Sequence, residues 1–359
     1  MYLPISMLKK INKYRRILTK TLTQNIGNSY KNLSIDLSEK VKVERVLICR
    51  PNHRLGNLLL ITPFIQEIAV TFPECKIDLF VKGGLGPIIF KNYENINTII
   101  ELPKKPFKNL LQYFSVWMKL KKYRYDIIIN IEKGSSSGRI ATQFANAKYK
   151  FFGKADEEVH SRYKDYEHIA KYPVYDFRLF LTTLGLKNNI SPIPSLNLKL
   201  SSAEIAEGKI ILDAIIKNNK KTICIFTYAT GNKCYSEPWW EEFYEKLKNE
   251  FEMNYNIIEV LPVENISQIG FKAPTFYSTD IREIGSLITN TTLFIGADSG
   301  IMHLSSAVNT TTVGLFSRDN QNKYEPYNNG SLAINTNNSS IDECIKTINS
   351  IIIEKQLRL

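Results

Sequence analysis

The sequence lacks long hydrophobic runs and has little cysteine. Nowhere in its 359 residues is there a stretch of about eighteen consecutive apolar residues, the length that a membrane-spanning helix needs. The first residues contain no compact apolar stretch followed by a small-residue cleavage site, so no signal peptide is expected. The five cysteines are scattered and never form a CxxC or Cys/His cluster. We therefore expect a cytoplasmic chain with reduced thiols and no metal site.

Acidic residues are outnumbered, with 35 Asp and Glu against 47 Lys and Arg and a formal net charge of +12. Ten basic and only three acidic residues lie among the first 45. Residues 8–22 could form a helix with leucines and isoleucines on one side and cations around them. Such a helix could bind an anionic membrane surface. Equally, it could be a solvated leader that packs a few leucines on the main domain. No known basic-aromatic nucleic-acid-binding motif follows, so nucleic acid is not an expected partner.

Short apolar runs alternate with helical patterns along the first half of the chain, which is typical of parallel α/β folds. Residues 57–72 carry helical spacing that Pro63 interrupts, so either Thr62 caps a new helix or one helix is kinked. The other elements predicted here are strands at 45–49, 76–81, 97–102 and 125–132, and helices at 110–120, from Arg139, and at 172–184.

The alternation restarts after residues 188–201, whose prolines, serines and asparagines are typical of an interdomain connection. The pattern predicts two Rossmann-like domains whose parallel sheets face a central cleft. The expected parts are a basic extension (1–40), an N-terminal acceptor domain (41–200), a C-terminal donor domain (201–340) and a final helix (341–359). Within the donor domain we expect helices at 202–218, 239–251, 281–290 and 300–308, and strands at 221–227, 256–262, 292–297 and 310–317.

The stretch FIGADSGIMHLSSAV, residues 294–308, leaves a strand through Gly296 and begins a helix near Gly300. Open α/β sheets bind ligands at this edge, and the first turn of a helix offers free amides and a partial positive charge to a phosphate. On residue type alone, Asp298 is explained as the helix N-cap and His303 as a residue of the helix surface.

Together with this stretch, the segment RPNHRLGNLLLITPFIQEI near the start carries a more specific signal. The pair resembles the heptosyltransferases of glycosyltransferase family 9, which build the inner core of lipopolysaccharide, and the resemblance runs over residues 43–330. It implies the GT-B fold, with two Rossmann-like domains, and a nucleoside diphosphate sugar donor, ADP-heptose being the leading candidate. It also implies inversion at the anomeric carbon without a metal or cofactor.

The resemblance also assigns donor-binding residues. One set matches the family element Asp-Thr/Ser-Gly-x-x-His and consists of Asp298, Ser299, Gly300 and His303. A second set stands where the family grips the diphosphate and consists of Thr230, Gly231 and Lys233, although Lys233 lies farther from Trp239 than is usual in the family. Without the resemblance, Lys233 would be a solvated surface lysine, and Trp239 and Trp240 would be buried aromatics that open a helix.

The residue at the family's catalytic-base position differs in this sequence. The family's aspartate, which deprotonates the acceptor hydroxyl, is replaced by Asn57, and an asparagine cannot accept a proton. We hypothesise that His53 or Glu132 takes this role; alternatively, both are ordinary loop and strand-end residues. Arg50 and Arg54, after the first strand, are candidates for binding phosphates or acidic sugars of the acceptor.

Two classes of function follow. The first is a sugar transferase at the cytoplasmic membrane face, acting on lipopolysaccharide or another lipid-linked acceptor. The second is a nucleotide-sugar-binding module that lost its chemistry with the aspartate. An epimerase on the same scaffold fits less well, because both heptosyltransferase-like motifs are present.

Overall fold

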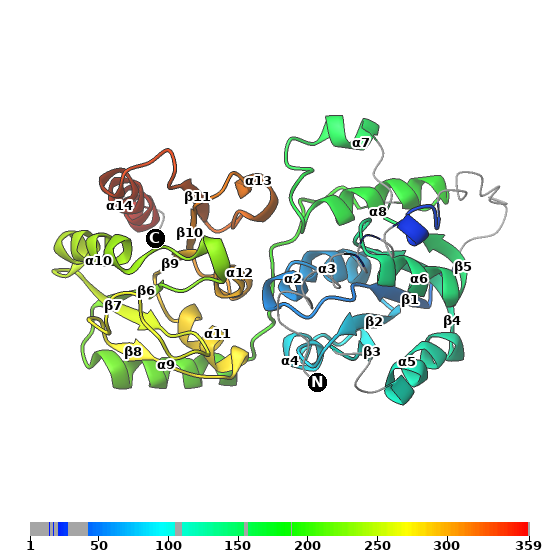
Figure 1. Ribbon diagram of the computed structural model, residues 1–359, viewed down its shortest axis with the longest axis horizontal. Helices are drawn as coiled ribbons and strands as arrows, with labels where there is room; N and C mark the ends of the chain where they lie inside the picture. The colour runs from blue at the N-terminus through cyan, green and yellow to red at the C-terminus, as the bar shows by residue number, and fades with distance from the viewer. Residues whose placement is uncertain are drawn as a thin grey trace.

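The computed structural model describes residues 14, 17, 21–27, 42–104, 110–153, 157–187 and 189–357. In this part of the chain two parallel sheets lie side by side, each with helices on both faces (Figure 1). The predicted α/β class is therefore confirmed. No helix among these residues is long and apolar enough to cross a membrane.

The first sheet has the strand order β3-β2-β1-β4-β5, and all its neighbouring strands are parallel. Its central strands are almost continuous apolar runs, because helices cover both faces. The strands are β1 (Arg45–Cys49), β2 (Lys76–Lys82), β3 (Ile96–Leu102), β4 (Arg124–Asn130) and β5 (Asn146–Phe151). The helices are α2 (Leu55–Leu59), α3 (Thr62–Thr71), α4 (Gly86–Ile89), α5 (Leu110–Lys122), α6 (Ser136–Phe144), α7 (Glu157–Arg162) and α8 (Tyr172–Thr183).

The second sheet has the strand order β11-β10-β9-β6-β7-β8, again all parallel. Its strands are β6 (Lys221–Phe226), β7 (Tyr255–Val260), β8 (Thr275–Phe276), β9 (Leu293–Ala297), β10 (Thr312–Phe316) and β11 (Leu332–Asn335). Its helices are α9 (Ser202–Ile216), α10 (Glu237–Phe251), α11 (Ile281–Thr289), α12 (Gly300–Ala307), α13 (Gln321–Tyr324) and α14 (Ile341–Leu357), and a 3-10 turn, η3, spans Gly231–Lys233. The domain boundaries drawn from the sequence stay predictions.

The helical pattern of residues 57–72 forms two helices. The break falls between α2 and α3, and α3 begins at Thr62 with Pro63 in its first turn, where a missing N–H costs nothing. Thr62 is not the cap: Ile61 occupies that position, and the Thr62 hydroxyl donates to the Leu59 carbonyl at 2.7 Å. The helix expected from Arg139 begins earlier, at Ser136, because Ser135 caps it by accepting from the Gly138 amide.

Several short elements escaped prediction. The edge strand β5 has the mixed sequence NAKYKF, and β8 contains two residues, so neither carries an apolar run. Most of residues 8–22 lie outside the described residues, so the structure does not describe a complete helix there. The end of this N-terminal segment is bound to the first domain, because Arg139 donates to the carbonyls of Gln24 and Ile26.

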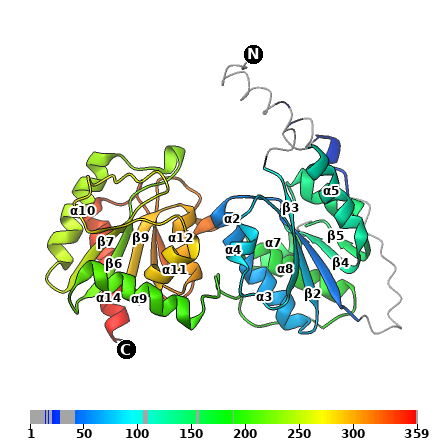
Figure 2. The same cartoon turned by 90° about the horizontal axis from the view of Figure 1, so that it is seen from below.

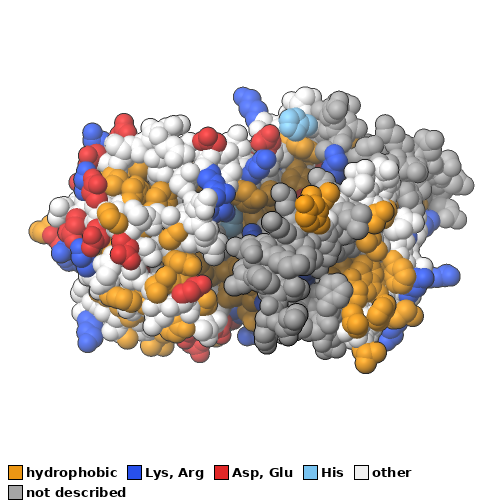
Figure 3. Space-filling model, viewed as in Figure 1, with side chains coloured by type: hydrophobic (Ala, Val, Ile, Leu, Met, Phe, Trp, Pro, Cys, Tyr) orange, Lys and Arg blue, Asp and Glu red, His pale blue; other side chains and the backbone are white. Residues whose placement is uncertain are grey.

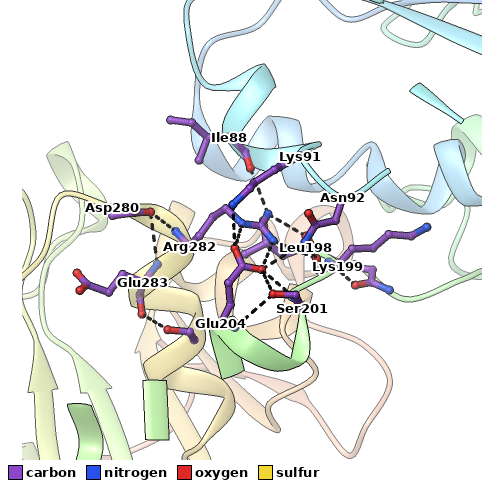
Figure 4. Close-up of polar contacts among 12 residues, drawn as sticks. Ile88, Lys91, Asn92, Leu198, Lys199, Ser201, Glu204, Asp280, Arg282 and Glu283 are labelled. Carbon is purple, nitrogen blue, oxygen red and sulfur yellow. Dashed lines mark hydrogen bonds and ion pairs between the residues drawn. The ribbon is translucent and has the colours of Figure 1, made fainter. Parts of the chain in front are cut away.

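A buried arginine ties the second domain to the first and to the connection between them (Figure 4). Arg282, at the start of α11, donates to Glu204 of α9 at 2.5 and 2.9 Å. It also donates to the carbonyls of Ile88 in the first domain and of Leu198 and Lys199 in the connection. The predicted connection, described from residue 189, contains no helix or strand up to residue 201 and is held by these bonds.

The two domains also meet through α2 and α12, which lie next to each other in both ribbon views (Figure 2). Glycines make this approach possible. A Cβ on Gly56 would lie 2.7 Å from Cδ2 of His303, and a Cβ on Gly300 would lie 3.2 Å from that of Leu55. The N-terminal turns of α2 and α12 are therefore adjacent.

Candidate functional site

The polar centre of the second domain lies where β6 and β9 end. Asp298 follows β9 directly, and Lys233 lies at the end of η3, a few residues beyond β6. The Lys233 ammonium is 2.5 Å from the Asp298 carboxylate, which is almost fully buried and also accepts from Asn320 at 3.2 Å. The two candidates that the sequence places far apart are thus an ion pair at one sheet edge.

The N-cap of α12 is Ser299, so the interpretation of Asp298 as the cap is wrong. The Ser299 hydroxyl accepts from the Met302 amide at 3.2 Å, which leaves its own O–H free to donate to a phosphate. Asp298 lies one residue before the cap, and its carboxylate is turned to Lys233. The remaining amides of the first helical turn are the groups that α12 offers to an anion.

His303 lies on the first turns of α12, buried against Gly56 of the other domain. Burial lowers the pKa of this imidazole to about 4; the Asp298 charge opposes this shift and the Lys233 charge adds to it. The ring is therefore neutral at pH 7. Its centroid is 6.3 Å from that of Tyr324.

The polar centre of the first domain is the pair of Arg50 and Glu132, which follow β1 and β4. Their side chains form an ion pair in which Arg50 is buried and Glu132 is one-third exposed. Arg50 Nε is also buried and has no hydrogen-bond partner among the described residues. The Glu132 carboxylate is thus fixed by its ion pair with Arg50, unlike the ordinary strand-end residue that was the alternative.

His53 and Arg54 lie in the loop before α2, and both are exposed. Partial burial lowers the pKa of His53, and the charges of Lys82, Lys104 and Arg54 lower it further. The loop thus places His53 among cations on the β2 and β3 side. Asn57 is half-buried in the first turn of α2, next to the Gly56 contact with His303.

Tyr324, which the sequence analysis missed, lies at the polar centre of the second domain. Its pKa is raised by burial first and then by the charges of Asp298 and Glu132, so carboxylates of both domains act on it. The Lys233 ammonium lies 5.5 Å from the centroid of its ring. Asn320, also missed, lies between β10 and α13, the short helix that ends at Tyr324. The available signal was the polar run SRDNQN that follows a buried strand, the position at which such sheets bind ligands.

The loop after β6 presents the remaining donor candidates. Thr230 and Gly231 are exposed, and Gly231 has φ +66° with open space where a Cβ would be, so this backbone is accessible to a ligand. Trp240 is fully buried and Trp239 is stacked on Tyr235 and Phe243, which confirms that these aromatics open a helix. Among the described residues, no group of three or more His, Cys, Asp or Glu side chains could hold a metal ion.

Comparison with known proteins fits this geometry. Residues 276–350, which include the Asp298–His303 element and Tyr324, match the model of glycosyltransferase family 9 (heptosyltransferase). Lipopolysaccharide heptosyltransferase 3 of Escherichia coli is 24% identical over 307 residues, covering 76% of this chain and 84% of the relative. The chain thus resembles the heptosyltransferases of glycosyltransferase family 9. The resemblance drawn from the two motifs and the expected enzyme class, a glycosyltransferase, are confirmed.

Other similar proteins point to the same family. Lipopolysaccharide core heptosyltransferase OpsX of Haemophilus influenzae is 24% identical over 294 residues, covering 77% of this chain and 80% of the relative. A family 9 glycosyl transferase from Veillonella parvula superposes with a TM-score of 0.69 at 16% identity, covering 88% of this chain and 99% of that structure. The E. coli heptosyltransferase WaaC with ADP gives 0.62 at 15% identity, covering 86% and 99%. These structures share the predicted two-domain GT-B fold.

Proposed function

We propose that this chain transfers a heptose, or a similar sugar, from a nucleoside diphosphate sugar to the core of lipopolysaccharide or another surface glycan. ADP-heptose is the leading donor candidate. The relatives named lipopolysaccharide heptosyltransferases and the solved WaaC complex with ADP support this choice. The observation that carries the proposal is the Lys233–Asp298 pair beside His303 at the start of α12, which packs against α2 of the domain that holds the Arg50–Glu132 pair.

The second domain supplies the groups that bind the donor. Lys233 would place its positive charge beside the diphosphate and stabilise the negative charge that grows on the leaving oxygen. The first-turn amides of α12 and the exposed backbone at Thr230 and Gly231 would add further donors. His303, neutral and buried, would donate or accept one hydrogen bond without adding charge. The reaction needs no metal and no cofactor in this proposal, because these groups carry the diphosphate charge.

The first domain supplies the base, and among the candidates the geometry favours Glu132. The Glu132 charge raises the pKa of Tyr324, whose ring lies beside Lys233 and His303, whereas the charges that act on His53 are those of Lys82, Lys104 and Arg54. Glu132 would take the proton from the acceptor hydroxyl. The acceptor oxygen would then bond to the anomeric carbon, from the face opposite the diphosphate, while the carbon–oxygen bond to the diphosphate breaks. This substitution inverts the anomeric centre.

The acceptor would lie over Arg50 and Arg54. A buried donor atom without a partner, such as Arg50 Nε, is costly and is usually satisfied by a ligand or water. We place the protein at the cytoplasmic face of the membrane, where residues 8–22 would contribute basic side chains to an anionic surface.

The test is a panel of ADP-, UDP-, GDP- and dTDP-sugars, first by thermal shift and then by release of the free nucleotide in the presence of lipopolysaccharide-derived acceptors. We expect one donor to stabilise the protein and to be consumed, and we expect Asp298→Ala to abolish the release. Stabilisation without release from any donor would contradict transfer and favour the binding module.

A further inference from the structure

Helix α5 of the first domain exposes an apolar stripe that its own fold does not use. Leu110, Leu111, Phe114 and Met118 are 51, 85, 63 and 64% exposed. At 100° per residue these four side chains fall within about 100° of the helix surface. The opposite side of α5 is the one that packs on the sheet, through Val116 and Leu120.

The chain segment that carries this stripe has positive charges only. Between Leu102 and Asp126 the sequence contains seven Lys or Arg residues and no Asp or Glu. Four of the cations, Lys119, Lys121, Lys122 and Arg124, follow the stripe, and within the described part of the chain none of them forms an ion pair. Figure 3 shows hydrophobic side chains gathered over α5 with Lys and Arg side chains beside them.

The position of α5 relates the stripe to the candidate site. The helix connects the end of β3 to the start of β4, so it runs antiparallel to the strands. Its N-terminal half, with Leu110 and Leu111, therefore lies toward the same edge of the sheet at which Arg50 and Glu132 lie. A membrane or other partner that contacts this half of α5 would therefore contact the domain that we propose binds the acceptor.

We propose that the outer face of α5 binds an anionic lipid bilayer, with the apolar stripe in the interfacial region and Lys119, Lys121, Lys122 and Arg124 on the lipid headgroups. Exposed apolar side chains next to cations without ion-pair partners are what an anionic bilayer complements, because it offers both hydrocarbon and negative charge. A protein partner would need acidic groups around an apolar centre, and nucleic acid would not use the leucines and phenylalanine. The proposal deepens the proposed function, since a membrane-anchored acceptor would reach the site from this surface.

The experiment is flotation of the purified full chain with vesicles of phosphatidylcholine, with and without phosphatidylglycerol, in the absence of donor and acceptor. We compare the wild type with the triple variant Leu111→Ser, Phe114→Ser, Met118→Ser. The matched control is Val70→Ser, Ile210→Ser, Met253→Ser, which removes three equally exposed apolar side chains that lie elsewhere. We expect the α5 variant to lose at least about tenfold in vesicle partitioning, the control to keep it, and vesicles without phosphatidylglycerol to bind weakly.

A second set of variants separates the two basic regions. Neutralising Lys119, Lys121 and Lys122 with glutamine should reduce binding, and the loss should exceed that of Lys9→Gln, Lys10→Gln, Lys13→Gln. Equal vesicle binding by wild type and the α5 triple variant would overturn the proposal, as would a dimer that dissociates in this variant during sedimentation. The vesicles contain no acceptor, so binding to them does not depend on sugar transfer. If the α5 variant lost vesicle binding and the wild type showed no sugar transfer, the membrane-binding proposal would be supported and only the proposed function would be overturned.

Discussion

At the scale of single residues, the candidate site contains two cation–carboxylate pairs, one in each domain. Lys233 pairs with Asp298, and Arg50 pairs with Glu132; the charges of both carboxylates raise the pKa of Tyr324. The pairs differ in exposure: the Asp298 side chain is 7% exposed, whereas that of Glu132 is 36% exposed. Because Glu132 is the more accessible of the two, it is the carboxylate that an acceptor hydroxyl can reach.

The base assignment predicts different effects for two substitutions. Glu132→Gln keeps the shape of the side chain but removes its ability to take a proton, so kcat should fall about 100- to 10,000-fold. His53→Ala should lower kcat less than about threefold, since His53 lies among cations away from Tyr324. Nucleotide release with saturating donor and acceptor measures both. Wild-type turnover in Glu132→Gln would exclude this carboxylate as the base.

The buried histidines predict how stability depends on pH. Burial lowers the pKa of His168 from 6.5 to about 4, and the pKa of His303 is lowered in the same direction. Below pH 6.5 the unfolded chain therefore binds protons that the folded chain does not. Stability should be complete above pH 6.5 and should fall as the pH drops toward 4, by up to about 3 kcal/mol for His168.

Urea unfolding between pH 4 and 8 checks this expectation. His168→Gln should flatten the acid dependence, because glutamine can keep a hydrogen bond to the Glu325 carbonyl without titrating. His160→Gln is the control, since His160 is exposed. An unchanged slope in His168→Gln would contradict the assignment.

At the scale of elements, the contact between α2 and α12 brings the two polar centres together. Both helices begin at the carboxyl edge of a sheet, and each presents a glycine to the other. A side chain larger than hydrogen at Gly56 would press on the His303 ring. The resemblance places Asn57 and His303 in the catalytic region, and the glycine contact explains how two helices from separate domains hold these residues close.

Gly56→Ala should therefore disturb the site more than the fold. Its Cβ would lie 2.7 Å from His303 Cδ2, so α2 or α12 must shift, and donor affinity should fall by about tenfold or more. Gly84→Ala is the matched control, because a Cβ there meets nothing within 4 Å. Isothermal titration with the donor, together with urea unfolding, separates affinity from stability. Unchanged affinity in Gly56→Ala would show that the helices accommodate the methyl group.

At the scale of the whole molecule, the Arg282 cluster holds the second domain, the connection and the first domain in one arrangement. The guanidinium is almost fully buried, and it holds the pKa of Glu204 well below its usual range. Glu204 also completes the capping box of α9 with Ser201. The half-buried Glu204 carboxylate thus both caps the first helix of the second domain and binds the arginine that joins the two domains.

Arg282→Leu should destabilise the protein by about 3 to 5 kcal/mol, because it leaves the Glu204 carboxylate and several carbonyls without their buried donor. Lys209→Leu is the control. It breaks the exposed Lys209–Asp213 pair on α9, the helix that also carries Glu204, and should cost less than about 1 kcal/mol. Urea unfolding measures both. A loss below that of the control would show that the cluster contributes little to the joining of the domains.

The sequence by itself determined the elements whose evidence is local. Continuous apolar runs predicted the buried strands, and the glycine-flanked stretch Phe294–Val308 predicted the strand-to-helix turn of β9 and α12. The local pattern is enough to predict such strands, because a strand that is buried on both faces consists of consecutive apolar residues. The edge strand β5 carries no such local signal, and Pro63 signalled an interruption of the helical pattern without deciding between a break and a kink.

The tertiary structure alone decided which polar groups meet. Arg50 and Glu132 are 82 positions apart, and nothing in either neighbourhood indicates the other. Ser299 caps α12 while the Asp298 carboxylate pairs with Lys233, which follows β6, and Tyr324 reaches the site from α13, after β10. Which polar side chains pair depends on how the strands are ordered within each sheet and on how the two domains pack. The α2–α12 contact sets the second of these.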